Sequence, residues 1–144
     1  MAVYRERMSD PRPPVRQLRL VVRVDGDFDA ALAFYRDALG LPVEESFEGE
    51  GDARVVILDA GRATLELANP AQVEMIDRVE TDGVTSPRLR VAFEVEDADG
   101  VTRTLVEHGA ELRASPRETP WRSLNSRLDA PGDLQLTVFE ELDR

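Results

Sequence analysis

Alternating hydrophobic and polar residues mark two segments of the chain as β-strands, residues 17–24 and 88–95. Every second residue is apolar from Leu18 to Val24 in the first segment and from Leu89 to Val95 in the second. Side chains of a strand point to opposite faces in turn, so each segment has one face suited to a hydrophobic core and one mixed face.

A helical pattern follows each of these strands. Apolar residues recur at helical spacing between Phe28 and Leu39, and a second helix is expected from residue 97 to about His108. Both helices begin at a side chain suited to the N-cap and end at a glycine suited to the C′ position. The caps are Asp27 and Asp97, and the glycines are Gly40 and Gly109.

The pattern of strand, helix, glycine and further strands occurs twice, which indicates a duplicated βαβββ unit. We expect one domain over residues 17–141, with module one at 17–68, a polar connector at 69–87 and module two at 88–141. The connector has room for only a short helix around 73–79, and residues 1–16 are expected to form a flexible N-terminal arm. The remaining strands are expected at 43–47, 54–59, 63–68, 110–114, 121–128 and 134–140.

The predicted fold is α+β, with two βαβββ modules whose curved mixed sheets form a cleft. Each sheet buries one face under its helix, so the mixed faces remain to line the cleft. Five side chains should therefore point into it, namely Arg19, Arg23, Glu66, Arg90 and Glu94. The last strand contributes either Gln135, Thr137 and Phe139 or the alternate set.

Composition narrows the range of functions. The chain has no cysteine, which excludes disulfides and thiolate metal sites, and no apolar run long enough to cross a membrane. A net charge of −11 argues against a nucleic-acid partner, and it suits either a cationic ligand or solubility alone. The N-terminus lacks the apolar stretch of a secretory signal, so we expect a cytoplasmic protein.

Four segments occur in a characteristic order: DFDAALAFYRDALGLPVEE, the hairpin ending ATLELANP, the strand LRVAFEVED, and the final TPWRSLNSRLDAPGDLQLTVFEE. In this order they resemble the glyoxalase/bleomycin-resistance/extradiol-dioxygenase superfamily, also called vicinal oxygen chelate. We expect a bacterial member of it. The resemblance runs from about residue 17 to 141. It implies paired βαβββ modules, often a homodimer, and a cleft that binds small molecules.

The resemblance also implies four metal-ligand positions, a histidine on the first and fifth strands and an acid on the fourth and last. Here these positions carry Arg19, Arg90, Glu66 and, with a register uncertain by one or two residues, Thr137. Arginine stays protonated and has no lone pair to give a metal, so no metal or other cofactor is predicted. The single histidine, His108, is expected at a helix end, where it would contact the helix dipole or solvent.

Two interpretations of Arg19, Glu66 and Arg90 stay open. Glu66 could bridge the two arginines in a partly buried ionic network that only supports the fold. Alternatively, two arginines around one glutamate could leave a net positive floor that binds a carboxylate or phosphate. Trp121 could stack on a ligand as a cleft wall, or it could serve core packing or dimer burial, as could Phe47 and Phe139.

Three classes of function compete. The first is a metal-free protein that binds or sequesters a small molecule, as in antibiotic resistance of the bleomycin type. The second is a lyase, isomerase or dioxygenase that uses a divalent metal, or a metal-free base such as Glu66 or Glu94. The third is a domain that acts through protein contacts, which a lone domain with a cleft makes the weakest of the three.

Overall fold

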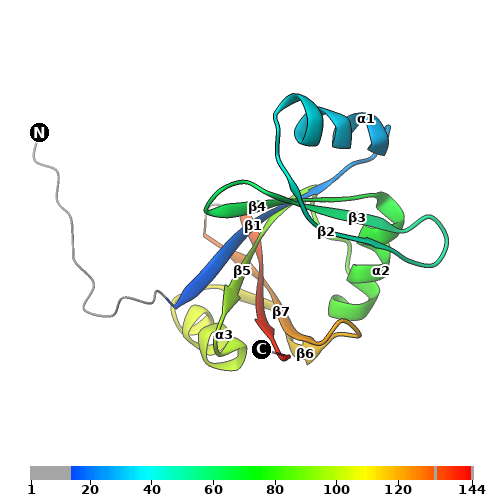
Figure 1. Ribbon diagram of the computed structural model, residues 1–144. Helices are drawn as coiled ribbons and strands as arrows, with labels where there is room; N and C mark the ends of the chain where they lie inside the picture. Colours follow the sequence, from blue (N-terminus) through cyan, green and yellow to red (C-terminus); the bar gives the residue numbers. More distant parts are fainter. Residues whose placement is uncertain (1–13, 132, 144) are drawn as a thin grey trace, which may run out of the picture.

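A single mixed sheet of eight strands runs through the molecule in the order β2-β3-β4-β1-β5-β8-β7-β6 (Figure 1). The computed structural model describes residues 14–131 and 133–143. The strands are β1 (Val15–Arg23), β2 (Val43–Glu48), β3 (Arg54–Asp59), β4 (Ala63–Ala68), β5 (Leu89–Val95), β6 (Glu111–Glu118), β7 (Ser123–Ala130) and β8 (Leu134–Glu141). The helices are α1 (Phe28–Ala33), which continues into the π-helical turn η1 (Phe34–Ala38), α2 (Pro70–Thr81) and α3 (Ala98–Glu107).

The sheet consists of two halves with the same topology. In the first half β1 pairs in parallel with β4, and in the second half β5 pairs in parallel with β8. The two halves join where β1 pairs antiparallel with β5. The predicted α+β fold, with two βαβββ modules and curved mixed sheets, is therefore confirmed.

Helices α1 and α3 cover the convex face of the sheet, one for each module. Leu32 of α1 packs with Val56, Leu58 and Leu67, and Ala98 of α3 packs with a matching cluster in module two. Both predicted N-caps form, because the side chain of Asp27 accepts a hydrogen bond from Ala30 N at 3.0 Å and that of Asp97 accepts one from Gly100 N at 3.0 Å. The two C′ glycines, Gly40 and Gly109, have φ angles of 85° and 106°, which only glycine adopts at low cost.

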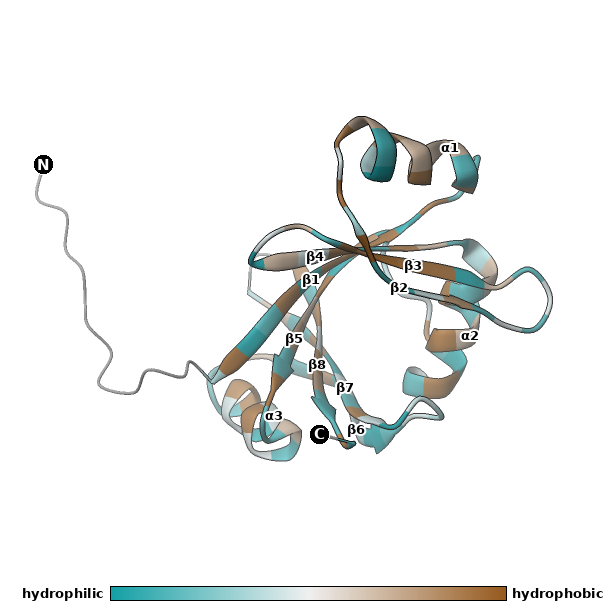
Figure 2. Ribbon diagram, viewed as in Figure 1, coloured by the Kyte–Doolittle hydropathy of each residue, from teal (hydrophilic) through white to brown (hydrophobic). Residues whose placement is uncertain are grey.

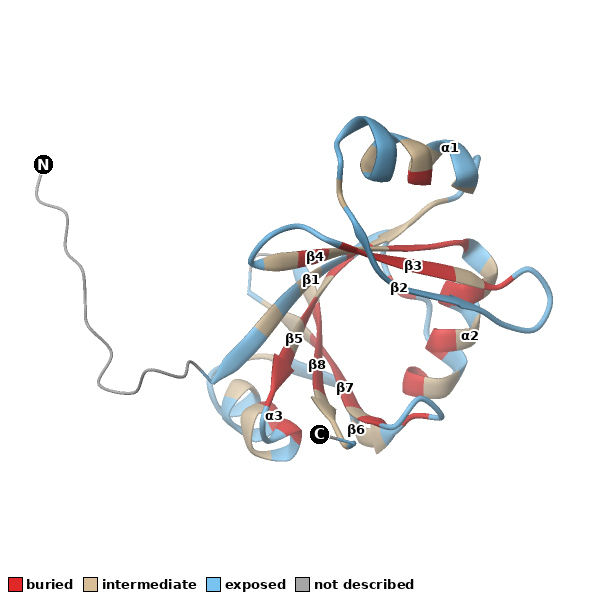
Figure 3. Cartoon of the chain, in the orientation of Figure 1, coloured by how far each residue is buried: buried red, intermediate tan, exposed pale blue. Residues whose placement is uncertain are grey.

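Helix α2 differs most from expectation, because the segment predicted as a polar connector is a twelve-residue helix. Asn69 caps it by accepting a hydrogen bond from Gln72 N at 3.0 Å, and Pro70 occupies the first turn, where a missing N–H costs nothing. The helix contacts β3 of module one and β6 and β7 of module two. It thus lies across the concave face, with buried residues along its inner side (Figure 3).

Strand β3 lies between two helices. Four of its six residues are buried, and hydrophobic residues run along its length (Figure 2). Val56 and Leu58 face α1, while Val55 and Ile57 face α2 and pack with Val73. This explains why the strand is apolar on both faces instead of alternating.

Three boundaries depart from the predictions. Strand β1 begins at Val15, inside the predicted arm, whose residues 1–13 lie outside the described residues. Strand β6 extends to Glu118, and Trp121, expected to begin a strand, lies instead in the turn before β7. In this turn Arg122 adopts a left-handed backbone conformation, with φ of 63°, which is uncommon for a residue other than glycine. Along the described part of the chain, every helix is too short or too polar to span a membrane.

Candidate functional site

A cavity of about 390 Å³ lies between the concave face of the sheet and helix α2. Six apolar side chains from both modules and from α2 line its inner part: Val21, Val55, Ile57, Ile76, Ala92 and Phe139. Its solvent side carries two exposed aromatic side chains, Phe47 and Trp121, which are 55% and 44% exposed. Three glutamates share that side: Glu45, Glu48 and Glu141.

Five of the seven residues predicted for the cleft line this cavity: Arg19, Glu66, Arg90, Trp121 and Thr137. The other two do not. Arg23 forms an ion pair of 2.8 Å with Asp25 beyond the end of β1. Glu94 is buried beside Gln17 and Phe139, four residues along β5 from Arg90 and outside the cavity lining. Alternation predicted the face of both residues, but it does not say where along a strand a cavity ends.

We refer to Arg19, Glu66, Arg90 and Thr137 as the floor cluster. Thr137 lies opposite Ala92 on β5, so the last strand presents Gln135, Thr137 and Phe139 to the concave face, the first of the two registers considered. A second hollow of about 380 Å³, beside Arg16 and Arg62, contains none of the predicted site residues.

Arg19 and Glu66 form one half of the floor cluster. The guanidinium and the carboxylate approach to 3.5 Å, with both side chains mostly buried. Arg19 also donates a hydrogen bond of 2.5 Å to Gln17 and lies over the Phe139 ring at 5.1 Å from its centroid. Three contacts therefore occupy the Arg19 side chain, and its cation is stacked on an aromatic face.

Arg90 has a different environment, although its side chain is only 5% exposed. Its Nη1 donates a hydrogen bond of 2.6 Å to the Thr137 hydroxyl. Among the described residues, no carboxylate oxygen lies within ion-pair distance of its guanidinium. Burial and the nearby Arg127 cation lower the pKa of Arg90, although an arginine remains protonated in a protein. Of the two ion pairs expected for Glu66, the one with Arg19 therefore forms and the one with Arg90 does not.

Glu66 is the titratable carboxyl of the floor cluster. Burial raises the pKa of its carboxyl, and the cations of Arg90 and Arg19 oppose this shift without cancelling it. A carboxyl whose pKa is raised in this way can hold or release a proton closer to neutral pH than an exposed one.

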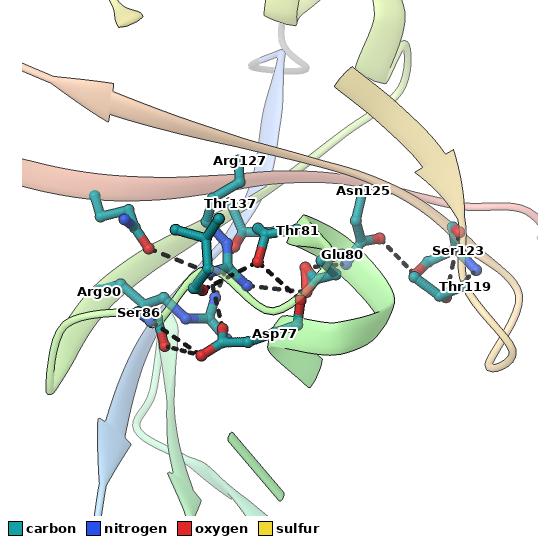
Figure 4. A network of polar contacts seen from close by, with 12 residues as sticks. Asp77, Glu80, Thr81, Ser86, Arg90, Thr119, Ser123, Asn125, Arg127 and Thr137 are labelled. Carbon is teal, nitrogen blue, oxygen red and sulfur yellow. Dashed lines mark hydrogen bonds and ion pairs between the residues drawn. The ribbon is translucent and has the colours of Figure 1, made fainter. Parts of the chain in front are cut away.

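Behind the floor cluster, a buried polar network joins α2 to β7 (Figure 4). Arg127 is 1% exposed and forms ion pairs with Asp77 at 3.1 Å and Glu80 at 3.3 Å. It also donates to Gln135 at 3.2 Å, and Asn125 donates to Glu80 at 3.1 Å. The network holds α2 against module two and thereby keeps the cavity wall in place.

Sequence reasoning did not find the contribution of α2. The cavity lining includes Gln72, Met75, Ile76 and Glu80 from this helix. A signal was available, because Asn69 followed by Pro70 is a helix start, and Val73 and Ile76 have helical spacing. The polar composition of the segment concealed it.

Comparison with known proteins identifies the family. Residues 17–138 match the model of the Glyoxalase/Bleomycin resistance protein/Dioxygenase superfamily. The chain belongs to this superfamily. The uncharacterized protein YraH of Bacillus subtilis (strain 168) is 28% identical over 130 residues, which are 88% of this chain and 97% of that protein.

Solved structures share the fold of this chain. A hypothetical protein from Bacillus halodurans C-125 has a TM-score of 0.64 at 14% identity, covering 90% of this chain and 95% of that chain. The methylmalonyl-CoA epimerase from Mycobacterium tuberculosis has a TM-score of 0.59 at 20% identity, covering 89% of this chain and 87% of that chain. At such identities the likeness shows a shared fold alone.

The floor cluster does not fit the divalent metal of the superfamily's enzymes. Of its four side chains only Glu66 is an anionic oxygen donor, and the two guanidinium groups would repel a cation. Across residues 14–131 and 133–143, no three His, Cys, Asp or Glu side chains come together as a set that could hold a metal ion.

Proposed function

We propose that this protein binds a small molecule with a flat, apolar part in the cavity, without a divalent metal. One observation carries the proposal: arginines occupy two of the positions at which metal ligands are expected, on the floor of a cavity that apolar side chains of both modules and of α2 also line. Phe47 and Trp121 at the solvent side offer flat surfaces on which a ring can stack. Such a protein would act by sequestering its ligand.

Metal independence is tested by thermal melting of the full chain with Ni²⁺, Zn²⁺, Mn²⁺ or Fe²⁺, together with elemental analysis of the purified protein. We expect no stoichiometric metal and no shift of the melting temperature. A ligand at 100 times its Kd stabilises the native state by about 2.7 kcal/mol, so a tightly bound metal would be detected. Stoichiometric metal with such a shift would refute metal independence.

Ligand binding has a built-in reporter, because Trp121 is the single tryptophan of the chain and lines the cavity. Naphthalene-2-carboxamide, a flat neutral probe, should quench its fluorescence with saturation. Phe47→Ala should weaken this binding. Quenching that is linear in the amide concentration, without saturation, would contradict a binding cavity.

An acid–base enzyme of the lyase or isomerase type is the second candidate, and the raised pKa of Glu66 favours it. Glu66 faces the cavity and could move a proton at a carbon next to a carbonyl, with Arg90 stabilising the oxyanion. The test is deuterium exchange at the α-carbon of a panel of aryl methyl ketones and arylacetic acids in D₂O. Exchange with the wild type that Glu66→Gln abolishes would favour the enzyme over the binding protein.

We further propose a homodimer. Three exposed apolar side chains lie together on the convex face where β1 meets β5: Leu18, Leu20 and Leu89. Neither α1 nor α3 covers this junction (Figure 1). A contiguous apolar patch of this kind marks a protein contact. Light scattering should give twice the chain mass, and Leu20→Glu should give the monomer; a wild-type monomer would refute the dimer.

A further inference from the structure

Three arginines of the concave face, the buried Arg90 and Arg127 and the mostly buried Arg19, differ in how their charges are compensated. Arg127 contacts two carboxylates, those of Asp77 and Glu80, and Arg19 contacts one, that of Glu66. Arg90 contacts a neutral hydroxyl instead. A buried cation usually has an anionic partner, because desolvation of an unpaired charge is costly.

The position of Arg90 explains why that cost is tolerated. Its side chain lines the cavity, so a molecule inside the cavity can reach its guanidinium. Within the described part of the chain, the carboxylates of Glu80, Glu66 and Asp77 act on Arg90 only from beyond ion-pair distance. Glu80 and Asp77 pair with Arg127, and burial favours the neutral form of Glu66. The positive charge of the floor is thus concentrated at Arg90.

Thr137 completes the arrangement. Its hydroxyl oxygen accepts the hydrogen bond from Arg90, so its hydroxyl proton remains available as a donor. A guanidinium and a hydroxyl side by side present several donors to one planar anion. Arg19 is a weaker candidate, because Glu66, Gln17 and the Phe139 ring already occupy it.

We infer that Arg90, with the hydroxyl of Thr137, anchors one anionic group of the ligand, a carboxylate or a similar planar monoanion. The inference rests on the proposed function and names the class of ligand for the same cavity. The apolar body of the ligand then lies against Phe139 and extends towards Trp121 at the solvent side. The glutamates at that side disfavour a second anionic group there, so the ligand is a monoanion with an apolar or cationic outer end.

Three probes of one shape and different charge test this inference on the full chain. They are naphthalene-2-carboxylate, the neutral naphthalene-2-carboxamide and the cationic naphthalen-2-ylmethylammonium, each titrated by Trp121 fluorescence and by calorimetry. Hydrogen bonds to a charged group predict that the carboxylate binds about 10- to 100-fold more tightly than the amide.

Variants locate the preference. Arg90→Gln should reduce carboxylate binding by most of this preference of about 10- to 100-fold. It should weaken amide binding by a much smaller factor, because the amide carbonyl is a neutral acceptor. Thr137→Val should weaken carboxylate binding by a smaller factor. Arg23→Gln is the matched control, because Arg23 lies on the same face of β1 as Arg19 but outside the cavity lining. It should change the binding of neither the carboxylate nor the amide.

The outcomes separate the inference from the function on which it rests. Equal binding of carboxylate and amide, or tightest binding of the ammonium probe, overturns the anion anchor and leaves the cavity as a binding site. Failure of all three probes to bind overturns both. If Arg90→Gln unfolds the protein, the affinities of the three probes for the wild type still decide between an anion anchor and none. If the variant folds and loses carboxylate and amide binding by the same factor, the anchor is also overturned.

Discussion

Replacing Arg127 by leucine is expected to lower the free energy of unfolding by about 3–5 kcal/mol, because it leaves two buried carboxylates without their partner. The guanidinium lies 3.1 Å from Asp77 and 3.3 Å from Glu80, whose side chains are 6% and 2% exposed. Leucine has an apolar side chain that cannot hydrogen-bond to either carboxylate. The main cost is therefore that of the two unpaired charges, since leucine still fills the space of the aliphatic stem of Arg127.

The expected loss is a large share of the 5–15 kcal/mol by which a domain is typically stable. For a chain of 144 residues it corresponds to a fall in melting temperature of about 10 °C or more. Thermal and urea unfolding followed by circular dichroism measure it. Arg117→Leu is the matched control, because Arg117 pairs with Asp82 at 2.9 Å on the surface and should cost less than about 1 kcal/mol.

A charge-free version of the network provides the second half of the test. Asp77→Asn and Glu80→Gln combined with Arg127→Leu remove all three charges and keep oxygen acceptors for Ser86 and Asn125. Most of the lost stability should return, since apolar or neutral replacements of buried ion pairs are often tolerated. If Arg127→Leu costs no more than Arg117→Leu, or if the triple variant is no more stable than Arg127→Leu, the reasoning is wrong.

Three further predictions concern α2 and the cavity. Asn69→Ala should lower the free energy of unfolding by about 1–2 kcal/mol and speed amide hydrogen exchange in the first turn of α2. The reason is that the Asn69 side chain accepts hydrogen bonds from Gln72 N and Arg54 N, each at 3.0 Å. Unchanged exchange rates would contradict this prediction. Burial raises the folded-state pKa of Glu66 above its ordinary value of 4.5, so the folded state favours the protonated carboxyl. The free energy of unfolding of the wild type relative to Glu66→Gln should therefore be highest below pH 4.5 and fall as pH rises through the raised pKa. Urea unfolding at a series of pH values measures this difference, and a rise with pH would contradict the prediction. Trp121→Ala should weaken binding of naphthalene-2-carboxamide, measured by calorimetry, about 2- to 10-fold. The melting temperature should not change, because Trp121 is 44% exposed and contributes little to the core. A large loss of stability would instead assign Trp121 to core packing.

Local patterns sufficed for most of the elements and for the face of each strand residue, although they missed the length of α2 and its place beside the cavity. Two-residue periodicity placed Arg19, Glu66 and Arg90 on the concave side, and the structure has them there. The caps and terminating glycines of α1 and α3 were equally visible, because capping depends on a side chain and an amide three residues apart. These features depend on neighbours along the chain, so the sequence by itself determined them.

The partners of the buried charges were decided only by the tertiary structure. Arg90 and Thr137 are 47 residues apart, and Arg127 and Asp77 are 50 apart, so no local pattern relates them. Alternation could not say that Glu66 would pair with Arg19, or that no carboxylate of residues 14–131 and 133–143 would pair with Arg90. Both depend on how the two halves of the sheet curve around α2. Choice among buried partners is settled by distances of a few ångströms across the fold, and those distances exist only once the strands, the helix and the cavity between them have formed.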